Sequence, residues 1–76
     1  MFEAGQVLRD TYIDGKLGRG GVVLRGVRQI RLIAREEDGR WLTQTIVDNH
    51  GATIENGRRT RVSEKTLATG YAPVED

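Results

Sequence analysis

The stretch from Gln29 to Val47, QIRLIAREEDGRWLTQTIV, decides the fold of this 76-residue chain. It holds two runs rich in β-branched residues, and these flank a short acidic turn that contains glycine. β-Branched residues favour strands, and the dipeptide Asp38-Gly39 suits the positive φ values that a tight hairpin turn requires. The stretch therefore predicts a β-hairpin that turns at Glu36-Glu37-Asp38-Gly39.

Side chains alternate between two faces along each strand of this hairpin. In the first strand, the face better suited to the core consists of Ile30, Leu32 and Ala34. The opposite face carries Arg31, Ile33 and Arg35. The returning strand offers two sets, and the pattern does not choose between them: Trp41, Thr43, Thr45 and Val47 against Leu42, Gln44 and Ile46.

Further short strands and turns flank the hairpin. Strands are predicted within 5–12, over Arg59 to Val62 with Thr60 and Val62 inward, and over Tyr71 to Val74, where Pro73 requires an edge or terminal position. Four glycines make 14–21 irregular, and a short apolar run follows over 22–27. Ser63 is expected to cap a helical turn that brings Leu67 onto the end of the barrel.

These elements predict an all-β fold in a single domain over residues 1–76. We expect five or six short strands in a small, partly open SH3-like barrel, with one short helical turn before the last strand. Closing the sheet hides strand edges that so short a chain has no other means to cover. An OB-type barrel is the less favoured alternative, because it usually carries a longer helix between its strands.

Composition excludes several other classes of protein. The chain has no Cys, so disulfides and thiolate metal sites are impossible, and a single His argues against a metal-built domain. No stretch approaches the roughly 18 apolar residues of a membrane span, and the N-terminus does not resemble a signal peptide. We therefore expect a soluble, cytoplasmic protein that has no membrane partner.

Three short motifs resemble a group of small actinobacterial and actinophage proteins of unassigned function. They are Gly5-Gln6-Val7-Leu8-Arg9-Asp10, Arg59-Thr60-Arg61-Val62-Ser63 and Thr69-Gly70-Tyr71-Ala72-Pro73-Val74. They correspond to that group's G-Q-V-x-R-D start, T-R-I/V strand and G-Y-x-x-V ending. The segment 12–27 is longer and richer in glycine than the group's usual turn. The resemblance implies a bacterial or phage context, with a cytoplasmic location in the host if the protein is phage-encoded, and it supplies no site residues.

Charge gives the main functional asymmetry, although the net charge is only +1. The window from Lys16 to Arg35 contains six basic residues and no acidic residue. If these side chains share an outward face, they form a basic stripe that is able to neutralise phosphates. Together with the adjacent Arg40 and Trp41, the candidate contacts for nucleic acid or a protein partner are Lys16, Arg19, Arg25, Arg28, Arg31, Arg35, Arg40 and Trp41.

Each of these candidates also has a structural interpretation. Arginines on an exposed sheet face commonly aid solubility or pair with acidic neighbours across strands. Trp41 is able to stack on a base, but we expect it to cap the core or an interface, where its large ring contributes most.

The sequence argues against catalysis. His50 lies in Asp48-Asn49-His50-Gly51, a composition typical of a turn, and no nucleophile or oxyanion site accompanies it. The segment Gly15-Lys16-Leu17-Gly18-Arg19-Gly20-Gly21 lacks the Gly-Lys-Ser/Thr ending and the following helix of a P-loop, so it predicts a flexible basic loop. No catalytic residue, metal, cofactor or small-molecule ligand is expected.

Two non-enzymatic functions remain. We favour a binding module that engages another protein or a second copy of itself through a strand edge or the Trp41 surface. The alternative is a nucleic-acid-binding accessory protein that uses the stripe from Lys16 to Arg35.

Overall fold

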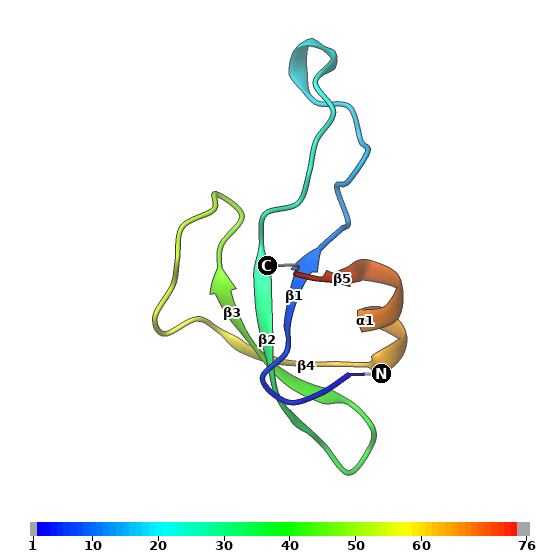
Figure 1. Cartoon of the computed structure of the whole chain (residues 1–76), viewed down its shortest axis with the longest axis vertical. Helices are drawn as coiled ribbons and strands as arrows, with labels where there is room; N and C mark the ends of the chain where they lie inside the picture. The colour runs from blue at the N-terminus through cyan, green and yellow to red at the C-terminus, as the bar shows by residue number, and fades with distance from the viewer. Residues whose placement is uncertain (1, 75–76) are drawn as a thin grey trace.

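The computed structural model describes residues 2–74, and the described part is mostly β-structure (Figure 1). The elements are β1 (Val7–Asp10), the 3₁₀ turn η1 (Arg19–Gly21), β2 (Gln29–Arg35), β3 (Trp41–Val47), β4 (Arg59–Val62), α1 (Glu64–Gly70) and β5 (Tyr71–Pro73). The five strands form one antiparallel sheet in the order β4-β3-β2-β1-β5. The predicted small β-domain is thus confirmed, whereas the sheet is not closed into a barrel. Among residues 2–74, no helix has both the length and the apolar character that crossing a membrane requires.

The hairpin from Gln29 to Val47 is confirmed as β2 and β3. At its turn, the Gly39 N–H donates to the Glu36 carbonyl at 3.0 Å, and the Glu36 N–H donates to the Arg40 carbonyl at 2.7 Å. Gly39 adopts a φ of +86°, a left-handed conformation that glycine enters without steric cost. In the Asp38-Gly39 pair, only Gly39 is left-handed. This is typical of longer hairpin loops, in which a type I turn is followed by a left-handed glycine.

A β-bulge interrupts the alternation of side chains along β2. Leu32 pairs with Thr43, whereas Ala34 pairs with Leu42, so Ile33 is an extra residue between two consecutive partners on β3. Ile30 and Leu32 are buried as predicted, but the prediction that Ala34 lines the core is wrong, because Ala34 is exposed. A shift of one residue moves every later side chain to the opposite face.

The core lies on one face of the sheet, under α1. Trp41 and Thr43 of β3 are buried there, with 5% and 1% of their surface exposed. The face of β3 that carries these two side chains is therefore the one that packs on the core, a choice that the sequence pattern left open. The Thr43 hydroxyl donates to the Thr60 carbonyl at 3.2 Å, which satisfies a polar group inside the core. The buried apolar side chains are Leu8, Ile30, Leu32, Trp41 and Leu67.

Helix α1 joins the two edge strands, β4 and β5, and covers the core. The Ser63 hydroxyl accepts a hydrogen bond from the Thr66 N–H at 3.2 Å, as the predicted N-cap requires. Leu67 is fully buried, and the helix extends over seven residues rather than a single turn. Pro73 lies in the edge strand β5, where its missing N–H leaves the sheet intact.

A long arm, residues 11–28, projects from the sheet between β1 and β2 and extends the molecule to 45 Å along its longest axis (Figure 1). Its first leg (residues 11–18) and second leg (residues 22–28) are joined by η1 at the tip. The apolar run 22–27 forms no strand of its own, and its pairing with the first leg is limited to one isolated β-bridge, Leu17 to Val23. Residues 2–74 therefore hold five strands rather than six.

Candidate interaction surface

The arm carries most of the large apolar side chains that are exposed in residues 2–74. Six of the seven belong to it, and the seventh is Val74 near the C-terminus. Tyr12 and Leu17 are the most exposed, each at 73%. Such clustering marks an interaction site more often than scattered apolar residues do. The six are Tyr12, Ile13, Leu17, Val22, Val23 and Val27.

The backbone of the arm explains this exposure. The Gly18 N–H donates to the Val22 carbonyl at 2.7 Å, and the Leu24 N–H donates to the Lys16 carbonyl at 2.8 Å, so the two legs form a narrow ribbon. A ribbon of two paired segments with no layer packed on it has no interior in which to bury its side chains.

A polar cluster fixes the arm to the sheet. The Asp14 carboxylate accepts hydrogen bonds from the Arg9 guanidinium at 2.8 Å and from the Gly26 N–H at 2.7 Å. These two contacts, the Arg9 ion pair first, hold the pKa of Asp14 below its ordinary value. Gly26 also lies so close to β1 that a Cβ atom there would stand 2.0 Å from the Asp10 carbonyl oxygen. The direction in which the arm leaves the sheet is therefore set by specific contacts.

A cavity of about 440 Å³ opens at the base of the arm, beside the turn that follows β3. Tyr12, Ile13 and Val27 give it apolar walls, and Asn49 of the turn contributes a polar side. Arg28 also lines it. The cavity therefore lies between the exposed apolar surface of the arm and the body of the protein.

Arg28 has a structural role within this region. Its guanidinium donates to the Tyr71 hydroxyl and to the Thr45 hydroxyl, each at 3.0 Å, and lies 3.6 Å from the Asp10 carboxylate. These partners come from β1, β3 and β5, so Arg28 links three strands and is not available as a free cation.

The remaining predicted cations divide between the arm and the sheet. Lys16 and Arg19 lie on the arm, together with Arg25, and Lys16 stands over the Tyr12 ring at 3.8 Å from its centroid. Arg31 is exposed on β2 opposite Val7 and Gln44. None of these four basic residues forms an ion pair with a carboxylate of residues 2–74.

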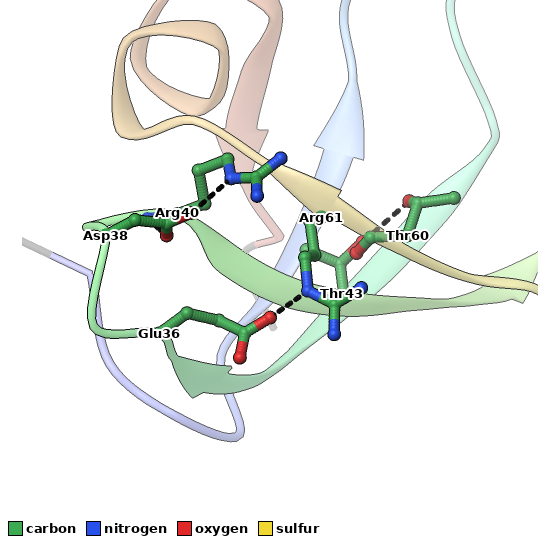
Figure 2. Close-up of polar contacts among 6 residues, drawn as sticks. All are labelled: Glu36, Asp38, Arg40, Thr43, Thr60 and Arg61. Carbon is green, nitrogen blue, oxygen red and sulfur yellow. Dashed lines mark hydrogen bonds and ion pairs between the residues drawn. The ribbon is translucent and has the colours of Figure 1, made fainter.

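Arg35 and Arg40 are both paired with acidic side chains. The bulge at Ile33 places Arg35 opposite Trp41, on the core side of the sheet, where it binds Glu64 at 2.9 Å. Arg40 binds Asp38 at 2.8 Å, and Figure 2 shows this pair beside the ion pair of Glu36 with Arg61. Arg31 and Arg35 thus lie on opposite faces, and the basic window does not form one continuous stripe.

Trp41 lies in the core with only 5% of its surface exposed, so its ring offers no face on which a base or a partner could stack. Its indole N–H has no hydrogen-bond partner within residues 2–74. Trp41 is therefore buried, whereas Lys16, Arg19, Arg25 and Arg31, with which the sequence grouped it, are exposed.

The segment around His50 forms the predicted turn. The Asp48 carboxylate accepts from the Ala52 N–H at 2.9 Å and the His50 N–H at 2.8 Å, and these bonds lower the pKa of Asp48. Both contacts are to the backbone, so Asp48 does not orient the imidazole. Within residues 2–74, no three carboxylate or imidazole side chains are grouped closely enough to hold a metal ion.

Sequence reasoning did not include the apolar residues of the arm among the candidate contacts. A signal for them exists, because Leu17 and Val22 immediately flank glycines of a segment that cannot form a packed element, and Val23 follows Val22. Apolar residues next to a glycine-rich turn have few neighbours on which to pack, and this predicts exposure.

Comparison of the chain with protein-family models, with curated proteins and with solved structures finds no match. The resemblance to small actinobacterial and actinophage proteins therefore stays a prediction, and the exposed arm is the feature from which we infer a function.

Proposed function

We propose that the protein is a non-enzymatic binding module whose arm engages another protein or a second copy of the chain. The observation that carries this proposal is the exposure of six large apolar side chains on one projecting element. The centres of protein interfaces are apolar, with Tyr and Arg enriched, and the arm combines such side chains with Arg19 and Arg25.

The fold is compatible with such a module. The strand order and the short helix between the two edge strands support the predicted, partly open SH3-like barrel. In that arrangement the arm is the connection between the first two strands. A cytoplasmic accessory role in an actinobacterium or its phage is part of the proposal, and its support is the resemblance of the three sequence motifs.

Selection of binding partners from a library of random 16-residue peptides displayed on phage tests the proposal. We expect enriched peptides to bind the wild-type protein and to lose binding when Leu17→Ser and Val23→Ser are combined. Both side chains are exposed, so the fold should tolerate the change. Val74→Ser is the matched control outside the arm. Binding that survives the double variant would contradict a role for the arm.

Self-association is tested separately by sedimentation equilibrium over a wide range of protein concentration. If a second copy is the partner, the wild type should show a monomer–dimer equilibrium that the Leu17→Ser/Val23→Ser variant shifts to monomer. A monomer at all concentrations would exclude self-association and leave a different protein as the partner.

Nucleic-acid binding is the second candidate, because Lys16, Arg19, Arg25 and Arg31 have no carboxylate partner in residues 2–74. Fluorescence anisotropy with labelled duplex and single-stranded DNA should then show affinity that falls steeply as salt rises. Charge reversal at Arg19 and Arg31 should abolish it. Arg28 is a poor choice for this test, since its reversal also breaks the contacts with Tyr71 and Thr45.

A further inference from the structure

The second leg of the arm has an open strand edge. The hydrogen bonds of alternate residues on this leg point inward. Leu24 exchanges backbone hydrogen bonds with Gly15 and Lys16 of the first leg. Gly26 donates to the Asp14 carboxylate and accepts from the Arg9 guanidinium of β1, and the Arg28 carbonyl accepts from the Asp10 N–H at 2.9 Å. The residues between them, Val23, Arg25 and Val27, form no backbone hydrogen bond within residues 2–74. Since N–H and C=O groups in an extended chain point alternately to its two sides, these three residues present donors and acceptors to the open side.

This open edge continues the edge of β2 that β3 covers. Pairing between β2 and β3 reaches Gln29 and Val47, and β3 then ends in the turn at Asp48. Beyond that point, the second leg extends past the sheet with no strand beside it (Figure 1). The cavity at the base of the arm, with Val27 on one side and Asn49 on the other, lies where a further strand would begin.

The side chains along the edge define what would pair there. Residues two apart in an extended chain share a face, so a strand that pairs with this leg would meet Val23, Arg25 and Val27 on the same face. Val23 and Val27 are 66% and 42% exposed, and Arg25 is exposed between them. Directly opposite residues on paired strands interact, so opposite charges favour pairing and like charges oppose it.

Charge also decides between the occupants. Two copies that paired through this edge about their two-fold axis would place Arg25 beside the partner copy's Arg25, with Lys16 and Arg19 of both arms close by. Nucleic acid would supply phosphates to pair with these cations, but it would give Val23 and Val27 only phosphates or water as neighbours. A strand with a carboxylate between two apolar residues matches all three side chains.

We infer that the second leg of the arm binds an extended, acidic segment of a partner protein by strand addition, a carboxylate facing Arg25 and apolar side chains facing Val23 and Val27. This inference depends on the proposed function, since it specifies the partner of the same arm. The complementary pattern in the partner is an apolar residue, any residue, Asp or Glu, any residue, and a second apolar residue. Backbone hydrogen bonds supply affinity, and the alternate side chains supply specificity.

The test is a titration of ¹⁵N-labelled protein with the synthetic peptide acetyl-TVTETVT-amide, followed by ¹H–¹⁵N NMR spectra. We expect the largest shifts at the amides of Val23, Arg25, Val27 and Asn49. The peptides TVTKTVT and TSTETST control for charge and for apolar contacts. Both should bind about 10-fold more weakly or not at all.

A charge swap makes the test specific. Arg25→Glu should prefer TVTKTVT over TVTETVT, whereas Arg58→Glu, an exposed arginine outside the arm, should leave the wild-type preference unchanged. Equal binding of the two peptides to the wild type, shifts confined to other surfaces, or no shift at millimolar peptide would each overturn the inference. The proposed function would survive such a result if library-derived peptides still bound in a manner that depended on Leu17 and Val23.

Discussion

At the scale of single residues, two glycines differ in how closely other atoms approach their backbone. A Cβ atom at Gly57 would lie 1.8 Å from the Thr45 carbonyl oxygen, far inside contact distance, whereas one at Gly70 would meet nothing within 4 Å. Gly57→Ala should therefore force the chain away from β3 and lower the free energy of unfolding by about 1–3 kcal/mol. Urea unfolding followed by the fluorescence of the buried Trp41 measures this change.

Gly70→Ala is the matched control at the end of α1. Because alanine has the higher helix propensity, we expect it to be neutral or to stabilise the protein by up to about 1 kcal/mol. Equal effects of the two substitutions would contradict the close approach at Gly57.

Asp14 should make the stability of the protein depend on pH. Its folded pKa is lowered, first by Arg9 and then by the Gly26 N–H, so the ionised carboxylate favours the folded state. That contribution is complete above the unfolded pKa of about 3.9 and is lost as the pH falls through the lower folded pKa. Asp14→Asn should therefore unfold at lower urea than the wild type at pH 7, and the difference should shrink as the solution is acidified toward pH 2.

Some acid sensitivity should remain in Asp14→Asn, since backbone N–H groups also lower the pKa values of Asp38 and Asp48. The same gap between Asp14→Asn and the wild type at every pH would disprove the role of the Asp14 carboxylate.

At the scale of elements, α1 is the piece on which the small core depends. Leu67 is the only fully buried side chain of the helix. Leu67→Ala should cost about 2–5 kcal/mol through lost contacts and a cavity, which is a large part of the stability of so small a domain. Removal of the cap in Ser63→Ala should cost about 0.5–2 kcal/mol.

Lys65→Ala changes an exposed residue of the same helix and should stay within about 0.5 kcal/mol of the wild type. Circular dichroism during thermal unfolding distinguishes the three variants. If Leu67→Ala were as stable as Lys65→Ala, α1 would not be covering the core.

The elements also show what the sequence could predict. Local signals identified the hairpin, the Ser63 cap and the edge position of Pro73, because each depends on residues that are close in the chain. The face of Ala34 and the position of Arg35 were not predictable, since the bulge at Ile33 arises from pairing with β3 and reverses the alternation after it.

The candidate site was predicted less well than the fold for the same reason. The pairing of Arg35 with Glu64 and of Arg28 with Asp10 joins residues that are distant in sequence. The glycines at 15–21 indicated an irregular segment, but they do not determine whether such a segment folds back or projects. The contacts of Asp14 with Arg9 and Gly26 decide this, and they require the three-dimensional arrangement.

At the scale of the whole molecule, stability and binding belong to separate parts. Of the five apolar side chains that are buried within residues 2–74, none comes from the arm, and all come from the sheet and α1. Replacement of residues 16–24 by Asn-Gly should therefore preserve the fold and change the free energy of unfolding by less than about 1 kcal/mol, a typical effect of loop length. The same variant should lose the interactions that depend on Leu17, Val22 and Val23, and global unfolding would show that the arm is part of the core.

The separation of these two parts is tested most directly in the free protein, by the broadening of methyl NMR signals with a water-soluble nitroxide at a concentration where the protein is monomeric. The methyl groups of Leu17, Val22 and Val23 should broaden strongly, whereas those of Leu8, Ile30 and Leu67 should broaden little. Methyl groups of the arm that are as well protected as those of the core would show that the arm folds back onto the sheet, and the proposed interaction surface would not exist.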